Sequence, residues 1–376
     1  MADTPLPADP EDAGRVVDQS ESRVFPCESC GADLEFSIDA QSLKCPFCGH
    51  VKELVFETEA AVREQDLHGA LQAVADRRAG GANTMEGIKQ VSCVDCGAEV
   101  RFQGTLTSQD CPYCGTPIQL EGVHDAEERI AVDGVLPFKV EREEARTNLK
   151  RWVQSRWFAP NEFKRRGAKG RFSGVYMPYW TYDAMTMNDY HGQRGEHYYT
   201  TVRRGDKTVR QRHTRWYPAS GSFRRFFDDV LVVAGRGLPD KVVRSLEPWP
   251  LQSCLPFTPA VLAGYLARTY DVSLSSGFDE AENRIEVAIR AEVRQRIGGD
   301  EQRIHSISVS YGAQTYKHLL LPVWLLAYKF GEKTFQVVVN AATGEVQGQR
   351  PYSWVKITLL VLSLVGVGGL IAYFAN

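Results

Sequence analysis

The 376-residue sequence lacks the motifs that would assign it to a common class of enzyme. There is no GxxxxGK[ST] phosphate-binding loop, because the two nearest stretches, 205–208 and 331–334, both lack the upstream glycine. The patterns HExxH, GxSxG and the paired glycines of dinucleotide-binding folds are also missing. An ATPase of the helicase class is therefore excluded, and we expect a protein that is not an enzyme.

The N-terminus has no apolar run of the kind found in secretory signals or transit peptides. Residues 1–22 are acidic and contain several prolines, which predicts a disordered leader. Without an export signal, we expect the nine cysteines to lie in a reducing compartment. Closely spaced cysteine pairs in such a compartment bind metal more often than they form disulfides.

Charge is missing altogether from residues 357–374, which would extend about 27 Å as a helix. A buried core helix is the alternative, but such a helix usually keeps a polar face. The stretch predicts one C-terminal transmembrane helix over 355–374. Arg350 and Lys356 precede it, so the positive-inside rule predicts a tail-anchored, single-pass protein of the inner (plasma) membrane with its N-terminal domains in the cytoplasm.

Eight of the nine cysteines form CxxC pairs, and the second four repeat the first four at a displacement of 66 residues. The two sets are Cys27, Cys30, Cys45, Cys48 and Cys93, Cys96, Cys111, Cys114. Their neighbours agree as well, since CPFCG at 45–49 matches CPYCG at 111–115. This internal duplication predicts two tandem zinc ribbons, over 23–56 and 88–122.

The cysteine spacing follows from the coordination chemistry of zinc. Four thiolates must surround Zn²⁺ at about 2.3 Å, and two CxxC turns joined by a short hairpin bring them together. We predict two structural zinc ions, because two matched pairs in each unit leave no open position for a redox role. His50 follows the fourth cysteine, but Thr116 stands at that position in the second copy, so His50 is not predicted to be a ligand.

The remaining chain predicts an α+β fold. Apolar residues on one face of 58–78 favour a linker helix over 57–81, which would dock within the chain or on a partner. Alternating aromatic residues, turn residues and helical patterns then predict an α+β domain built on antiparallel sheet over 125–350. Within it, Cys254 is interpreted as a buried thiol. His191, Glu196 and His197 are a conceivable metal or acid/base cluster, and their alternative is a set of solvated positions on a hairpin.

The charge is divided along the chain. Residues 1–138 carry −15, with 10 Lys and Arg against 25 Asp and Glu, whereas 139–225 carry +12, with 20 against 8. The basic segment is interspersed with Trp152, Trp157, Tyr176, Trp180, Tyr198, Tyr199 and Trp216. Such a mixture is typical of nucleic-acid binding, which is the alternative function. Acidic ribbons would repel phosphates, however, so nucleic acid is the less favoured partner. The segment would otherwise contact anionic membrane lipid or be a solvated basic face.

The paired ribbons, the stretches GVYMPYW (174–180) and LLLPVWLLAY (319–328), and NAATGEVQGQRP (340–351) occur together in this chain. In this combination the chain resembles a bacterial family of membrane-anchored double zinc-ribbon proteins, the YdjG-like proteins, often mislabelled as primosomal-helicase-like or TFIIB-type zinc-finger proteins. The resemblance implies a non-enzymatic adaptor that recruits cytoplasmic proteins to the membrane in a membrane-stress response. The partners it implies are a PspA-like protein and a flotillin-like (SPFH) protein.

Overall fold

The structure is a computed structural model. It describes residues 25, 27–32, 34–54, 62–79, 88–93, 98–103, 108–110, 113, 117–119, 123–125, 130–166, 171–204, 207–263, 265–267, 270–330 and 333–375. The predicted leader, 1–22, lies outside these residues.

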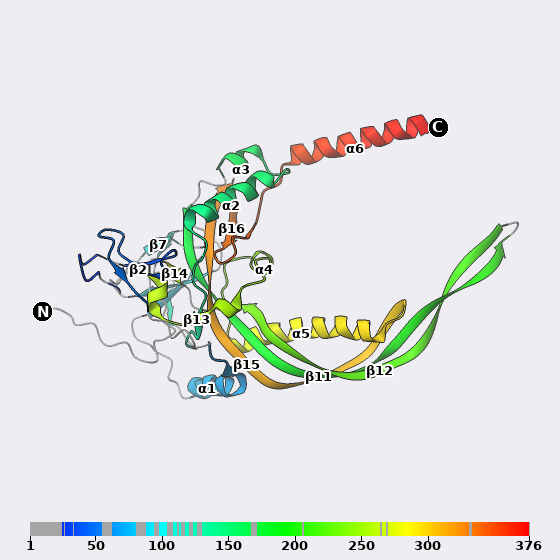
Figure 1. Cartoon of the computed structure of the whole chain (residues 1–376). Coiled ribbons are helices and arrows are strands. Elements are labelled where there is room, and N and C mark those ends of the chain that lie inside the picture. The colour runs from blue at the N-terminus through cyan, green and yellow to red at the C-terminus, as the bar shows by residue number, and fades with distance from the viewer. Residues whose placement is uncertain are drawn as a thin grey trace.

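Three very long strands organise the molecule: β11 (Arg171–Arg204), β12 (Lys207–Val233) and β15 (Glu301–Phe330). They are 34, 27 and 30 residues long and pair antiparallel in the order β12-β11-β15. Figure 1 shows them leaving the body of the molecule as one long, curved arm. β11 and β12 are the two strands of one hairpin, since Arg204 pairs with Lys207.

Shorter strands extend this sheet within the body. They are β4 (Gln65–Asp66), β10 (Gly134–Val135), β13 (Leu255–Pro256), β14 (Leu266–Ala267), β16 (Lys333–Asn340) and β17 (Val346–Gly348). Most pairs are antiparallel, but β10 runs parallel to β15 and β14 runs parallel to β11. A sheet with these long strands dominates the described residues, so the prediction of an α+β fold is wrong: the fold is mostly sheet.

Helix α5 (Leu274–Ile297) covers the part of the arm nearest the body. Its buried side chains recur at helical spacing, with Ala281, Ile285, Ile289 and Val293 all on one stripe. This stripe packs against Tyr190, Phe223 and Phe227 of the sheet. The remaining helices are α1 (Leu67–Ala79), α2 (Arg142–Ser155), α3 (Asn161–Arg166), α4 (Asp240–Arg244), η3 (Leu251–Ser253) and η4 (Pro259–Leu262).

The aromatic and proline-containing stretches form the core of the body. Trp180, Tyr182 and Trp324 are almost completely buried, and each donates a hydrogen bond to a backbone carbonyl. Trp180 Nε1 bonds Val272 O at 2.9 Å, and Tyr182 OH bonds Leu274 O at 2.8 Å. These bonds satisfy the polar atoms that burial would otherwise leave unpaired. Trp180 and Tyr182 of β11 therefore hold the start of α5 against the sheet.

The C-terminal helix α6 (Trp354–Ala375) extends away from the body and ends at the C-terminus. Within the described residues, no helix combines the length and the apolar character needed to cross a membrane, so the prediction of a transmembrane helix over 355–374 is wrong. The first turn is also held to the body, because Lys356 Nζ lies 2.8 Å from both Ala159 O and Asn161 Oδ1.

Candidate metal centre

The first cysteine set lies in a small unit formed by β1 (Glu35–Ser37), β2 (Ser42–Lys44) and β3 (Val51–Lys52). The three strands form an antiparallel sheet in the order β1-β2-β3. We call residues 25–54 ribbon 1. Two tight turns at one end of this sheet each carry a CxxC pair.

Backbone hydrogen bonds fix both turns in the same way. Gly31 N donates to Cys27 O at 2.8 Å, and Gly49 N donates to Cys45 O at 3.1 Å. Gly31 and Gly49 have φ values of 70° and 74°, in the left-handed region where a side chain is strained. The glycine that follows each pair is therefore required by the backbone of the turn.

The four sulfur atoms converge on one point. Cys27 Sγ lies 3.5 Å from Cys48 Sγ, and Cys30 Sγ lies 3.5 Å from Cys45 Sγ. All four sulfurs lie within 4.8 Å of one another. A tetrahedral ion with bonds of about 2.3 Å to sulfur would place its ligands about 3.8 Å apart. The site can therefore hold a metal ion.

The pKa values of the four thiols indicate that the site needs a positive charge if all four are to be ionised. The backbone N–H groups of Cys48 and Phe47 lower the pKa of Cys45 to about 6, although burial opposes this. The pKa of Cys48 is raised to about 12, because burial and its neighbouring thiols outweigh the backbone N–H of His50. Ionising one thiol thus makes the next harder to ionise, and four thiolates need a cation between them.

Ribbon 1 is packed against the body. Phe36 is only 3% exposed, and its N–H donates to Ala263 O at 2.9 Å, just after η4. Gln41 Nε2 donates to Phe138 O at 3.1 Å. One face of ribbon 1 therefore packs against the sheet domain. The metal site and its turns lie at the outer end of ribbon 1.

The second set is described only in part. Short strands β5 (Ile88–Ser92), β6 (Glu99–Gln103) and β9 (Val123–Asp125) form one sheet, and β7 (Ser108–Asp110) pairs with β8 (Pro117–Gln119). Cys93 is buried, and its N–H donates to Ala98 O at 2.8 Å, as Cys27 N donates to Ala32 O at 2.7 Å. Cys96, Cys111 and Cys114 lie outside the described residues. A second metal site over 88–122 stays a prediction.

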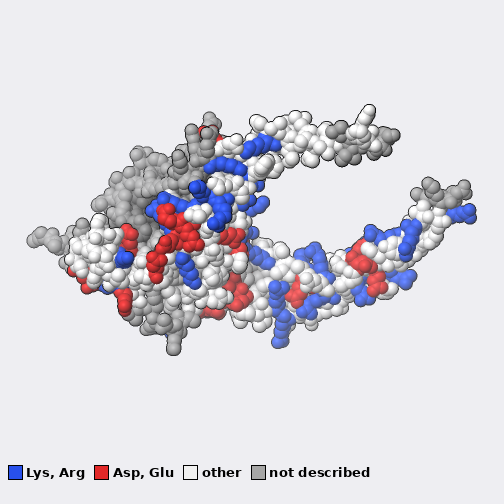
Figure 2. Space-filling model, turned by 45° about the horizontal axis from the view of Figure 1, so that its top comes forward, with Lys and Arg blue, Asp and Glu red and all other residues white. Residues whose placement is uncertain are grey.

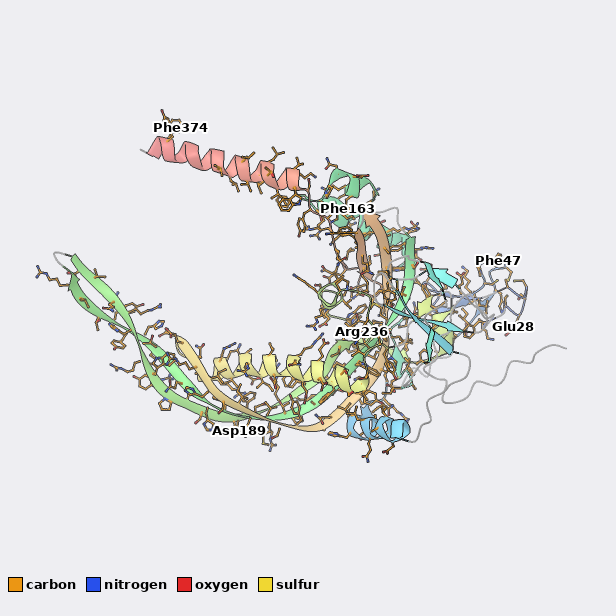
Figure 3. The ribbon with its side chains drawn as sticks, turned by 180° about the vertical axis from the view of Figure 1, so that it is seen from behind. Glu28, Phe47, Phe163, Asp189, Arg236 and Phe374 are labelled. Atoms are coloured by element: carbon orange, nitrogen blue, oxygen red, sulfur yellow. The ribbon has the colours of Figure 1, made fainter. Side chains whose placement is uncertain are left out.

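The duplicated turns differ in what surrounds their aromatic residue. Phe47 of CPFCG is 81% exposed and lies at the outer end of ribbon 1 (Figure 3). Its counterpart Tyr113 of CPYCG is fully buried. Gln336 Nε2 of β16 donates to Tyr113 O at 2.8 Å, and a side chain at Gly237 would come within 3.3 Å of the Tyr113 ring. Tyr113 thus packs on the body, whereas Phe47 is exposed.

Other candidate residues from the sequence do not meet at one site. His197 Nε2 lies 2.7 Å from Glu301 Oε1, a contact between two strands of the arm. His191 is exposed and lies six residues back along β11, about 20 Å away in an extended strand. Cys254 is half-buried, and burial raises the pKa of its thiol to about 12. These residues form no cluster that would perform catalysis.

A buried ion network was missed from the sequence. Lys317 Nζ lies 2.8 Å from Asp229 Oδ1 and 3.6 Å from both Asp183 Oδ2 and Glu64 Oε1. Oxygens of Asp183, Asp228 and Asp229 are close enough together to hold a cation, and the Lys317 ammonium supplies one. The signal in the sequence was a lysine, Lys317, just before the long apolar run at 319–328, which a second lysine, Lys329, follows. Such a lysine needs an acidic partner if its strand is buried.

The geometry defines this chain as a sheet protein with a four-cysteine candidate metal centre in an N-terminal ribbon. Compared with curated proteins, the chain is similar to the uncharacterized protein YdjG of Bacillus subtilis (strain 168). The two are 23% identical over 352 residues, which cover 91% of this chain and 94% of YdjG. YdjG is thus a distant homologue over nearly the whole length. No family model matches the chain, and no solved structure matches it.

Proposed function

We propose that the protein is a non-enzymatic adaptor of the YdjG-like family, which uses its zinc ribbons to bind a cytoplasmic protein at the inner membrane. The observation that carries this proposal is the difference between Phe47 and Tyr113. Within the described residues, the aromatic residue of the duplicated motif packs on the chain's own sheet in one copy, as Tyr113, and is exposed in the other, as Phe47. An exposed aromatic residue on a rigid turn is the kind of residue on which protein interfaces depend most.

Zinc is the metal that fits the site best. Four cysteines within one small ribbon form a soft, tetrahedral ligand set, which favours zinc over harder cations such as magnesium or calcium. The ion would be structural, because all four positions are filled by protein ligands. It would hold the turn that carries Phe47 in place for a partner.

Replacement of Phe47 by Asp is expected to weaken partner binding at least 30-fold, the effect of losing about 2 kcal/mol at an interface hot spot. The purified full-length chain and its F47D variant are compared for binding to the PspA-like and SPFH proteins of the same bacterium. Zinc content should not change, because the Phe47 side chain is 81% exposed.

The matched control is Trp157→Asp. Trp157 is also a large exposed aromatic residue, at 74%, but it lies between α2 and α3. Binding that is unaffected by F47D, or reduced equally by both substitutions, would show that the turn of ribbon 1 is not the contact.

Membrane lipid is the partner we propose for α6. Leu359, Leu362, Leu364 and Val365 are each more than 60% exposed, and no described residue covers them. Apolar surface of this extent is rarely left in contact with water. Its contact with lipid would keep ribbon 1 close to the membrane.

Truncation after Tyr352, which removes α6, is expected to move the protein from the membrane fraction to the supernatant. The apolar contact is lost, and any electrostatic contact that remains is screened in a high-salt wash. The measurement is immunoblotting of both fractions from cells expressing the full or the truncated chain. A truncated chain that stays with the membranes after that wash contradicts the role of α6.

Nucleic-acid binding is less well supported. Two of the aromatic residues considered for base stacking, Tyr176 and Trp180, are fully buried in the core. Trp152 is half-buried beside Arg156, whose Cζ lies 4.5 Å from its ring centroid. The described basic and aromatic residues of 139–225 are therefore divided between α2, the core and the arm, and among these described residues there is no continuous stacking surface.

A further inference from the structure

The outer end of the arm is a two-stranded hairpin. Gly195 of β11 pairs with Glu301, the first residue of β15, so the third strand begins there. Beyond it, only β11 and β12 continue, paired as far as Arg204 and Lys207. We call residues 196–204 and 207–215 the distal hairpin. Helix α5 ends at Ile297, and Figure 1 shows the distal hairpin extending past both α5 and β15.

One face of the distal hairpin is basic. Directly paired residues of antiparallel strands share a face, and faces alternate along each strand. Tyr199 pairs with Arg212, Thr201 with Arg210, and Arg203 with Thr208. Within the described part of the chain, none of these three arginines forms an ion pair with an acidic side chain. Arg210 Cζ lies 4.5 Å from the Tyr199 ring centroid, which keeps that ring within the basic face.

The opposite face is partly apolar between two charged pairs, Glu196 with Arg215 and Arg204 with Lys207. Tyr198 pairs with His213, Thr200 with Gln211, and Val202 with Val209. Tyr198, Val202 and Val209 are 40%, 41% and 47% exposed. The Tyr198 and His213 rings stack with centroids 5.3 Å apart, and His213 Nε2 lies 2.8 Å from Thr200 Oγ1. Apolar side chains that are ordered but uncovered indicate a surface made for contact.

We propose that the distal hairpin binds the surface of a membrane that contains anionic lipids. Headgroup phosphates complement the arginines of one face, and the headgroup and acyl boundary accommodates the tyrosine and valines of the other. A nucleic acid on the basic face would leave the apolar face exposed to water. Figures 1, 2 and 3 also show α6 and the arm extending from the body to the same side.

The test is amide hydrogen exchange of the full-length chain, followed in peptides of the distal hairpin. Outward amides of a two-stranded hairpin have no partner strand and exchange quickly. Vesicles of phosphatidylcholine that contain phosphatidylglycerol are expected to slow this exchange, whereas phosphatidylcholine alone is not. Because the readout is local, it does not depend on whether α6 also binds the vesicles.

Replacing Arg203, Arg210 and Arg212 by Gln is expected to weaken the contact about 100-fold, roughly fivefold per arginine, and so to abolish the slowing. The control carries the same charge change at the exposed residues Arg151, Arg290 and Arg294, and it should retain the slowing. Val202→Ser with Val209→Ser should weaken the contact without removing its dependence on phosphatidylglycerol.

Three results would overturn the proposal: no slowing with either vesicle, equal slowing with both, or stronger slowing by a single-stranded oligonucleotide than by the vesicles. The last result would assign the hairpin to nucleic acid. Phe47→Asp should leave the exchange of the distal hairpin unchanged, because Phe47 lies on ribbon 1. Failure of this proposal and failure of the adaptor function are therefore separate outcomes.

Discussion

Cys45→Ser is expected to remove one zinc ion per chain and to unfold ribbon 1 while the sheet domain stays folded. Cys45 is 1% exposed and supplies one of four converging sulfurs, so serine leaves a three-thiolate site that binds zinc far more weakly. Zinc supplies roughly 10–16 kcal/mol to the folding of small ribbons. Ribbon 1 contributes only a few buried apolar residues of its own, such as Phe36 and Leu43, and these do not replace that energy.

Elemental analysis of fresh, reduced protein gives the stoichiometry, and limited trypsin digestion reports the fold. We expect two zinc ions in the wild type and one in the variant, with new cleavage at Lys44 and Lys52. Cys254→Ser is the matched control, because Cys254 lies outside both cysteine sets, and it should keep both ions. A wild-type chain with one ion would contradict the second site, and a C45S chain with unchanged zinc would contradict the first.

The metal centre was predictable because its geometry is local. A CxxC turn fixes two sulfurs within four residues, and the glycine after each pair marks the left-handed backbone seen at Gly31 and Gly49. The different environments of Phe47 and Tyr113 were not predictable. They depend on Gln336 and Gly237, which are far from Tyr113 in the sequence and reach it only through the folded sheet.

The fold was predicted less well, because its strands continue far beyond the short stretches of sequence whose residue pattern indicates a strand. Strand β15, for example, runs without a break from Glu301 to Phe330, across the polar residues that precede the apolar run at 319–328. Pairing with β11 carries the strand across these polar residues. Near η4, the short strand β14 forms where Leu266 pairs with Val175. In both places, long-range pairing outweighs local propensity.

The arm also depends on a register shift that no short sequence motif predicts. Between Tyr182 and Ala184, the pairing of β11 with β12 shifts at Asp183. Asp183 is 1% exposed and accepts a hydrogen bond from Asp229 N at 2.5 Å. Asp229 has a φ of 50°, which non-glycine residues seldom adopt. The carboxylate of Asp183 thus stabilises the irregular backbone opposite it. The ammonium group of Lys317 forms an ion pair with this carboxylate.

Lys317→Met is accordingly expected to lower the free energy of unfolding by about 3–5 kcal/mol near neutral pH, the usual cost of leaving a buried carboxylate without its partner. Lys317 is 9% exposed as a residue, so water replaces its ammonium poorly. Methionine keeps most of the side-chain volume. The loss in the free energy of unfolding therefore measures the effect of the missing charge and not the effect of a cavity. Lys241→Met, at an exposed position of α4, is the control and should change stability by no more than about 0.5 kcal/mol.

The loss should depend on pH in a defined direction. Burial raises the pKa of Asp183 to about 6, and the nearby Lys317 opposes this rise, so removing the lysine should raise the pKa further. A carboxyl group whose pKa is higher in the folded state contributes most below its unfolded pKa, and that contribution is lost as the pH rises through the folded value. Urea unfolding should therefore show a smaller deficit at about pH 5 than at about pH 8.

A second substitution separates charge from packing. Asp183→Asn keeps an oxygen that accepts the hydrogen bond from Asp229 N but removes the charge. Added to Lys317→Met, it should restore a large part of the lost stability, because neighbouring groups in one network are not additive. A deficit that is the same at both pH values, or that Asp183→Asn makes worse, would mean that Lys317 acts through packing of its alkyl chain against the sheet and not as the partner of Asp183.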